Sequence, residues 1–392
     1  VGGREGAARA DFAVPRYQVD QKGDFVLLGN VLGFDCAANV GIPAPVVGTV
    51  GACGMNANDQ TMDVYWRADS PAPGQATADT SITPAQARTT AVLDLPAGAV
   101  VTKAFLYWGA RVAAPAGADL NVTLDRQGGF SASVDAIQSY LLTPQPGISF
   151  YQSVADITAL VQAQGAGPYR VGGVNTAVLA DLAENIHYAG WWMTVFYALP
   201  TDPPRNLALF DGLDLVGSNP GVTTSIAGFV VPNAGFDAKL GVIAFEGDNT
   251  LLGDEIKFGG SILSNGLNNA NNFFNGTRSF FGQPVSVGGD LPQTTGGVRS
   301  LSGLDLDVVD VKNILVPGQI QAQIQANTVN DAYFLAGFVT SIATFKPDFS
   351  ASGKSVVDVN GGDLLPGDVL EYTIFFFNDT ATTEIYTVLT DV

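Results

Sequence analysis

An internal duplication constrains the fold of this 392-residue chain more than any other feature. The first copy contains TTAVLDLPAGAVVTKAFLYWGA from Thr89, and the second contains TSIAGFVVPNAGFDAKLGVIAFEGD from Thr224. Each joins an alternating strand to a second strand through a turn that contains Pro and Gly. The first copy continues with SVADITALVQAQGAGPYRVGGVNT and AGWWMTVFYAL. The second copy continues with DVVDVKNILVPGQIQAQIQANT and AGFVTSIATF. These matches, in the same order, indicate a copied structural unit.

The residue pattern of both copies is typical of β-strands. Runs of Val, Ile, Thr, Phe and Tyr are separated by Gly (46 in all) and Pro (21) at turn-like intervals. We therefore predict an all-β fold of two tandem, related antiparallel β-sandwiches, jelly-roll or Ig-like in kind. One short helix is predicted in each sandwich, with Ser153 and Asp307 as N-caps and with Asp156 and Asp310 as the acids at N3.

Two irregular stretches suggest where the chain divides. YALPTDPPRN (197–206) holds three prolines and TFKPDFSASGK (344–354) has no periodicity, so both are predicted linkers. The predicted domains are an N-terminal segment with the first sandwich (1–200), the second sandwich (201–347) and the truncated start of an Ig-like repeat (348–392). That last part, KSVVDVNGGDLLPGDVLEYTI and the residues after it, has room only for the opening strands of a repeat.

The charge of the chain bears on its partners. Lys and Arg number 18 against 37 Asp and Glu, a net charge of −19. So acidic a chain repels phosphate backbones, and no basic stripe offsets this, so nucleic acid is not an expected partner. The most apolar stretch, AGWWMTVFYAL, is too short to span a bilayer. The chain opens with VGGREGAARADF and no apolar signal core, so we expect a targeting peptide to lie upstream.

The two cysteines, Cys36 and Cys53, lie in one Gly- and Pro-rich loop, GFDCAANVGIPAPVVGTVGACGMN. A metal site needs more soft ligands than these two. We favour a disulfide that closes the loop over two free thiols, and a disulfide predicts an extracellular location.

Catalytic motifs are sparse in this sequence. The sole histidine, His187, has no Gly-x-Ser-x-Gly nucleophile turn to accompany it, so we expect a packing or surface role. A hydrolase that uses two carboxylates stays open, because any β-sandwich could present such a pair, but no residues single one out. The chain is therefore predicted not to be an enzyme.

One stretch, FEGDNTLLGDEIKFGG, gathers hard oxygen ligands in a loop with glycines. Its candidate Ca²⁺ ligands are Glu246, Asp248, Asn249, Asp254 and Glu255. Ca²⁺ is the one cofactor that the sequence suggests. A solvated hairpin loop explains the same residues, and we favour it because the spacing matches no strict calcium motif.

Aromatic residues suggest two further surfaces. Trp66, Trp108, Trp191 and Trp192 could form a platform on which a sugar stacks, although core packing is favoured for most of them. Because side chains alternate along a strand, one of Trp191 and Trp192 must face outward unless something covers it. In SNGLNNANNFFNGTRSFFG (264–282), the two Phe-Phe pairs are expected to hold a long loop onto the sandwich; if exposed, they would form a patch for a partner.

Several stretches resemble a known family. AGWWMTVFYALPTDPPRNLALFDGLD, NAGFDAKLGVIAFEGDNT, NNANNFFNGTRS and LDLDVVDVKN resemble the N-terminal region of very large extracellular proteins of gliding bacteria, many of which carry the label adventurous gliding motility protein C. In that family the region precedes an array of Ig-like repeats of the DUF11 type, and KSVVDVNGGDLLPGDVLEYTI is similar to the start of the first repeat. The resemblance covers nearly the whole chain and brings no catalytic residues.

The C-terminal stretch departs from that repeat pattern. Residues 378–387, NDTATTEIYT, look like the translation of a common DNA-sequencing adapter, and the three Phe before them look like a translated run of T. We therefore expect 375–387 to be a sequencing artefact and base no fold argument on it.

Together these patterns predict a non-enzymatic secreted or cell-surface protein. Its tandem sandwiches would form the head of a long repeat array and serve adhesion or gliding motility. The expected partner is a cell-surface or extracellular-matrix component, and a glycan is one such partner. The alternative is a glycan-binding β-sandwich module that uses an exposed aromatic strand face with Ca²⁺.

Overall fold

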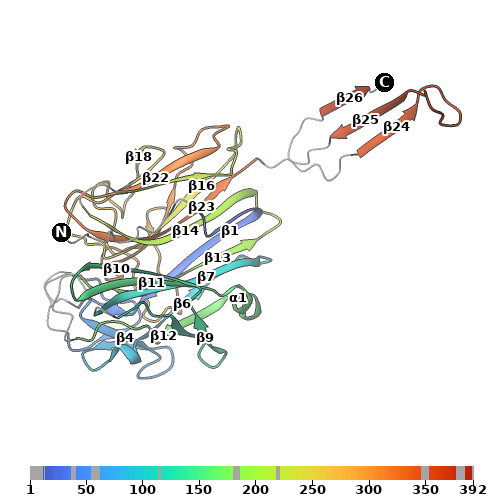
Figure 1. Ribbon diagram of the computed structural model, residues 1–392. Coiled ribbons are helices and arrows are strands. Elements are labelled where there is room, and N and C mark those ends of the chain that lie inside the picture. The colour runs from blue at the N-terminus through green and yellow to red at the C-terminus, as the bar shows by residue number, and fades with distance from the viewer. Residues whose placement is uncertain are drawn as a thin grey trace, which may run out of the picture. The chain divides into compact units, whose positions relative to one another are not determined.

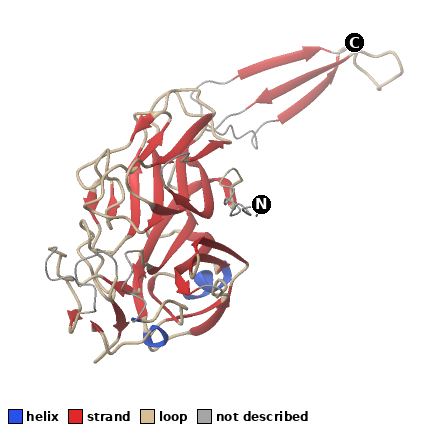
Figure 2. Cartoon of the chain, turned by 60° about the vertical axis from the view of Figure 1, so that its left-hand side comes forward, coloured by secondary structure: helices blue, strands red, loops and turns tan. Residues whose placement is uncertain are grey.

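The computed structural model describes residues 12, 14–36, 41–53, 62–113, 116–179, 186–217, 221–345, 353–376 and 385–390. Strands make up 51% and helices 3%, so the predicted all-β sandwich-type fold is confirmed (Figure 2). The chain forms two compact units, Val1–Ala343 and Thr344–Val392. We call the first unit the body.

The described residues of the body form four β-layers stacked face to face (Figure 1). In hydrogen-bonded order, the first layer contains β3 (Thr49–Val50), β5 (Ala76–Asp79), β4 (Val64–Ala68), β6 (Arg88–Leu93), β12 (Gly167–Gly172), β8 (Asn121–Asp125) and β9 (Ser131–Asp135), with β2 (Gly33–Phe34) beside β4. The second contains β10 (Gln138–Gln145), β11 (Ile148–Asp156), β7 (Val100–Ala113), β13 (Ala189–Ala198) and part of β1 (Tyr17–Val31).

The other two layers belong to the second copy. The third contains the rest of β1, then β14 (Pro204–Val216), β23 (Tyr333–Ala343), β16 (Ala238–Phe245), β21 (Leu304–Asp310), β19 (Arg278–Phe280) and β20 (Gln283–Pro284). The fourth contains β15 (Val222–Ala227), β22 (Gln321–Asn327), β17 (Glu255–Phe258) and β18 (Ser261–Ile262).

Strand β1 belongs to both copies. Its residues 17–22 pair with β14 and its residues 23–31 pair with β13, both antiparallel. The change of partner falls at Gly23, which has φ +142° and whose Cβ, if present, would lie 1.9 Å from the carbonyl oxygen of Tyr197. Only glycine fits this position, which is where β1 passes from the third layer to the second.

The two copies share one strand order, as the sequence duplication predicts. In the large layers, β11-β7-β13 corresponds to β21-β16-β23, and every pair is antiparallel. In the small layers, β6-β12-β8-β9 corresponds to β15-β22-β17-β18. The predicted linker at 197–206 is shorter than expected, because only residues 199–203 lie between β13 and β14. The copies are therefore closely joined.

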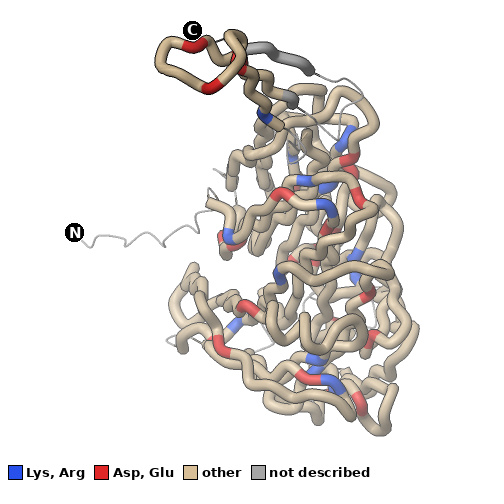
Figure 3. The backbone as a smooth tube through the Cα atoms, turned by 90° about the vertical axis from the view of Figure 1, so that its right-hand side faces the viewer, with Lys and Arg blue, Asp and Glu red and all other residues tan. Residues whose placement is uncertain are grey.

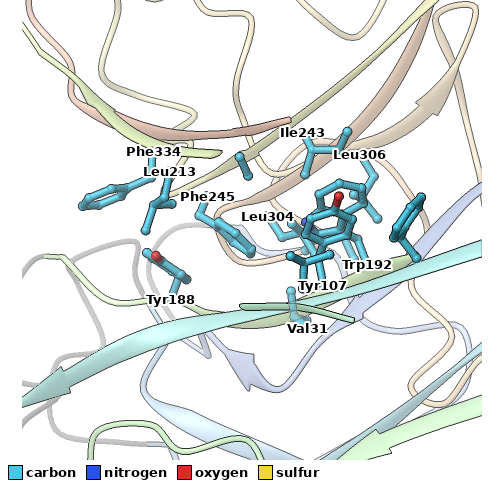
Figure 4. Close-up of a cluster of buried hydrophobic side chains, with 14 of the residues drawn as sticks. Val31, Tyr107, Tyr188, Trp192, Leu213, Ile243, Phe245, Leu304, Leu306 and Phe334 are labelled. Carbon is cyan, nitrogen blue, oxygen red and sulfur yellow. The ribbon is translucent and has the colours of Figure 1, made fainter. Parts of the chain in front are cut away.

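Three hydrophobic cores separate the four layers. One core lies inside each sandwich, and the third lies between the two large layers and extends to β2, β4 and β5 of the first layer. Figure 4 shows this central core, to which the first copy contributes Val31, Tyr107, Tyr188 and Trp192, and the second contributes Leu213, Ile243, Phe245, Leu304, Leu306 and Phe334. Gly109 and Gly337 allow this close approach, since a Cβ there would touch Phe245 and Trp192 of the opposite layer. Each copy thus covers the face that the other would expose.

The helix prediction is right for one copy and wrong for the other. Among the described residues the first copy holds α1 (Thr158–Gln164) and a short 3₁₀ turn, Pro84–Gln86, while residues 312–314 of the second copy form a turn. Asp156 and Asp310 accept a hydrogen bond from the N–H two residues later in both copies. In the second copy Pro317 follows too soon for a helix to continue.

The described residues of the second unit form a three-stranded antiparallel sheet. It contains β24 (Gly353–Asp358), β25 (Leu370–Phe376) and β26 (Ile385–Thr390) in that order. Residues 377–384, on which most of the predicted sequencing artefact falls, lie outside the described residues. Of the helices in the described residues, none is long and apolar enough to cross a membrane.

Candidate metal centre

Two of the five predicted Ca²⁺ ligands point to other partners. Glu246 follows β16 with a positive φ of 68° and is buried. Burial raises the pKa of Tyr188 in the central core, and the charge of Glu246 raises that pKa further. Glu255, on β17, forms an ion pair with Lys257 at 2.6 Å. Glu255 is thus held by Lys257, and Glu246 lies close enough to Tyr188 for its charge to act there.

The other three, Asp248, Asn249 and Asp254, lie in a loop that meets two further loops. The Gly253 N–H donates to the Asn271 carbonyl at 2.7 Å, and the Val329 N–H donates to the Gly253 carbonyl at 3.2 Å. The Asn272 side-chain amide donates to the Asn249 carbonyl at 2.8 Å. We call the meeting of residues 248–254, 271–274 and 328–332 the three-loop junction.

Two buried carboxylates in the junction each have one bonded and one unbonded oxygen. Asp254 Oδ2 accepts from the Phe274 N–H at 2.6 Å, and Asp331 Oδ1 accepts from the Ala332 N–H at 2.6 Å. Asp254 Oδ1 and Asp331 Oδ2 are buried and accept no hydrogen bond from the described residues. The backbone therefore orients each carboxylate and leaves one oxygen unsatisfied.

Two side-chain amides add further unsatisfied oxygens. Asn249 Oδ1 and Asn272 Oδ1 are also buried and accept no hydrogen bond from the described residues. A buried acceptor without a donor costs about 1–3 kcal/mol, so native proteins contain few of them. Four such oxygens in one junction need a physical explanation.

The electrostatics of the junction favour a positive charge. Burial raises the pKa of Asp254 to about 6. Burial also raises the pKa of Asp331 to about 7, and the charges of Asp248 and Asp254 raise it further. A cation at the junction would relieve both effects, because it stabilises the ionised carboxylates.

The ligand set available to a metal here consists of oxygens. Across the described residues, one group of three Cys, His, Asp or Glu side chains lies within 4.8 Å, namely Cys36, Cys53 and Asp63. Its two sulfurs form a disulfide and are not free to bind a metal. Asp248, Asp254 and Asp331 do not form such a group, so a metal at the junction would need amide or carbonyl oxygens as well as carboxylates.

A second acidic pair lies in the same half of the body. Asp305 Oδ1 accepts hydrogen bonds from the backbone N–H groups of Asn275, Gly276 and Thr277 at 3.0–3.1 Å. Asp307 accepts from the hydroxyls of Thr277 and Ser279. Both acids are fully buried, so they hold the 275–279 segment in place and do not form a solvent-facing catalytic pair.

Asp307 lies in β21, so the prediction that it is a helix N-cap is wrong; Ser153 likewise lies in β11.

The tryptophan platform predicted as an alternative is not available. All four Trp side chains are fully buried. Trp191 and Trp192 do point to opposite faces, into the core of the first sandwich and into the central core. The second copy covers the face that would otherwise expose Trp192.

The Phe pairs of the 264–282 loop differ in exposure. Phe273 and Phe274 are buried as expected. Phe280 and Phe281 are each 44% exposed and stack with ring centroids 4.3 Å apart. Phe281 has a φ of 52°, a conformation that nonglycine residues rarely adopt. This pair is therefore an aromatic surface accessible to a partner.

The remaining predicted residues have structural roles. Cys36 and Cys53 form the predicted disulfide, with Cα atoms 5.6 Å apart. His187 is buried with its ring against the Arg111 guanidinium, with Nδ1 at 3.1 Å from Nη1. Figure 3 shows Lys and Arg interspersed with Asp and Glu along the body.

Sequence reasoning missed Asp331 and Asn272, because both lie far along the chain from the acidic loop. Asp331 follows Thr328, Val329 and Asn330, and no sequence motif there marks it as a metal ligand. Comparison of the chain with protein-family models, curated proteins and solved structures finds no match.

Proposed function

We propose that this chain is a non-enzymatic secreted or cell-surface protein whose body is the head of a surface structure that serves adhesion or gliding. The observation that carries the proposal is a disulfide-bonded β-body followed in series by a separate unit, whose strand pairing between residues 354–358 and 370–374 lies outside the predicted artefact. Disulfides persist in oxidising compartments, and β-sandwich domains are frequent in cell-surface proteins.

The contacts between the two copies of the body favour slow unfolding, a property that suits a protein outside a cell. Its two copies cannot separate without exposing the aromatic central core and breaking the pairing of β1 with either β13 or β14. Slow unfolding of a body held by such contacts would protect it from proteases and shear. The resemblance of LDLDVVDVKN and NNANNFFNGTRS to gliding-motility surface proteins supports the same role.

A glycan-binding module is the second candidate. Burial of the four Trp removes the platform first considered for it, whereas the exposed Phe280–Phe281 stack offers an apolar face to a sugar ring. A glycan array probed with the full chain, with Ca²⁺ and with EGTA, tests this candidate. Binding that is lost in a Phe280→Ala, Phe281→Ala variant supports it, and an array without signal removes it.

Surface localisation is the direct test of the leading proposal. Antibodies raised against the body should label intact source cells or the surrounding medium, and external protease should remove the cell-bound label. Labelling that appears only after the cells are permeabilised would contradict the proposal. An antibody against a cytoplasmic protein serves as the control for cell integrity.

A further inference from the structure

We propose that the three-loop junction binds one Ca²⁺ ion through Asn249 Oδ1, Asp254 Oδ1, Asn272 Oδ1 and Asp331 Oδ2. This inference is independent of where the protein acts. It also differs from the ligand set suggested by the sequence: Asn272 and Asp331 join Asn249 and Asp254, and the set does not contain Glu246, Asp248 or Glu255.

The unsatisfied oxygens carry the argument. Asp254, Asn272 and Asp331 are 0%, 4% and 5% exposed, so water does not solvate them freely. Their other polar atoms are already bonded, with Asp254 Oδ2 held by the Phe274 N–H and the Asn272 amide held by the Asn249 carbonyl. Each remaining oxygen is therefore fixed in direction and can be satisfied only by a donor or a cation that enters the junction.

The orientation of Asn272 is fixed by its neighbours. Its side-chain nitrogen donates to the Asn249 carbonyl at 2.8 Å, so an exchange of the nitrogen and oxygen positions would lose that hydrogen bond. The side-chain oxygen thus lies at the contact between the 248–254 and 271–274 loops. An amide held in this way is a pre-organised neutral ligand.

The chemistry of the set matches Ca²⁺. Ca²⁺ accepts six to eight oxygens from carboxylates, side-chain amides, backbone carbonyls and water in flexible geometry. Two carboxylates offset its charge, and the two amides and nearby carbonyls contribute without adding negative charge. Zn²⁺ prefers nitrogen and sulfur ligands, which this set lacks, and Mg²⁺ requires octahedral geometry and retains its waters.

Binding would connect two layers of the second copy. The 248–254 loop joins β16 of the third layer to β17 of the fourth, and the 328–332 segment joins β22 of the fourth layer to β23 of the third. An ion held by Asp254 and Asp331 therefore ties both connections to the 271–274 loop. Ca²⁺ should stabilise the folded body by mass action.

Calorimetric titration of the full chain tests the proposal directly. The protein is first treated with EGTA and exchanged into chelator-free buffer, and CaCl₂ or MgCl₂ is then added. We expect one Ca²⁺ per chain and an upward shift of the unfolding midpoint with Ca²⁺, with binding at least ~10-fold weaker for Mg²⁺. No Ca²⁺ binding, or Mg²⁺ binding as tight as Ca²⁺ binding, would overturn the assignment.

Two isosteric variants separate binding from folding. Asp254→Asn and Asp331→Asn keep an acceptor for the bonded N–H and remove a charge, so each should fold in EGTA at least as well as the native chain. Each should weaken Ca²⁺ binding at least ~10-fold and lose the Ca²⁺-dependent shift. A variant that folds and retains the full shift shows that its residue is not a ligand and overturns the proposed set.

Matched control variants complete the experiment. Glu255→Gln removes a carboxylate that lies in the same sequence stretch as Asp254 but is paired with Lys257. Asp363→Asn removes an exposed carboxylate from the second unit. Both should bind Ca²⁺ like the native chain. Equal weakening in these controls and in the junction variants would mean that Ca²⁺ responds to net charge alone, which contradicts a built site.

Discussion

The Tyr107 hydroxyl donates to Asp211 Oδ2 at 2.8 Å across the central core. Tyr107 lies in β7 of the first copy and Asp211 in β14 of the second. The Arg16 guanidinium also pairs with Asp211, and the Tyr140 hydroxyl donates to its other oxygen at 3.2 Å. The two copies are therefore joined by a buried polar network as well as by apolar packing.

Removal of the Asp211 charge should destabilise the body strongly. Asp211→Ala leaves Arg16, whose side chain is 13% exposed, without the anion of its ion pair, and the expected loss in free energy of unfolding is roughly 3–5 kcal/mol. Tyr107→Phe leaves the ion pair in place and should cost about 1–2 kcal/mol. Urea unfolding followed by Trp fluorescence measures both, because all four Trp lie in the body.

An exposed ion pair provides the control for this network. Lys103 pairs with Asp156 at 2.7 Å, with both side chains about a third exposed. Lys103→Met should therefore change stability by less than about 1 kcal/mol. If Asp211→Ala costs no more than Lys103→Met, the network does not hold the copies together.

The change of partner in β1 should depend on Gly23. An added Cβ would lie 1.9 Å from the Tyr197 carbonyl oxygen, and the φ of +142° is strained for any other residue. Gly23→Ala should lower the free energy of unfolding by more than about 3 kcal/mol, or prevent folding. Gly288→Ala, where nothing lies within 4 Å of an added Cβ, should be close to neutral. Similar stability of the two variants would show that β1 can cross between layers without glycine.

The disulfide should stabilise the loop that it closes. Cys36 and Cys53 are 17 residues apart, and closure of a loop of this length restricts the unfolded chain by about 3 kcal/mol. A Cys36→Ser, Cys53→Ser variant should unfold at lower urea concentration, and the native chain in reducing agent should match it. Reducing agent should leave the double variant unchanged. A native chain that is insensitive to reduction would contradict the expected contribution.

Local patterns in the sequence predicted the repeated parts of this structure well. Alternation correctly placed Trp191 and Trp192 on opposite faces, and the order of motifs correctly predicted the shared strand order. The crossing of β1 and the packing of the two copies could not be read in the same way, because the residues that permit them, Gly23, Gly109 and Gly337, are three glycines among 46.

The candidate site was harder to anticipate for a similar reason. Asp248, Asn249 and Asp254 are neighbours in sequence, whereas Asn272 and Asp331 join them only through loop contacts that the fold creates. The helix predicted in the second copy failed on a local detail. Asp310, predicted at N3 of that helix, instead ends β21 and accepts a hydrogen bond from the Lys312 N–H of a turn, and Pro317 then ends the segment early.

The buried Asp307 should make the body more stable at acidic pH. Burial raises its pKa from 3.8 to about 7, offset in part by hydrogen bonds from Ser279 and Thr277. Burial and then the charge of Asp307 raise the pKa of the neighbouring Asp305 well above its usual value. The same segment also contains Arg278, which pairs with the buried Asp290. Because the folded state holds the proton more tightly than the unfolded state does, this contribution is full below about pH 4 and is lost as pH rises through about 7.

Asp307→Asn should remove that dependence. Between pH 5 and pH 8, at constant saturating Ca²⁺, the free energy of unfolding of the native chain should fall relative to the variant by an amount on the order of 2 kcal/mol. Asp363→Asn, which removes an exposed charge outside the body, should follow the native chain across the same range. If Asp307→Asn also follows the native chain, Asp307 ionises with an ordinary pKa, and the buried acid pair does not store a proton in the folded state.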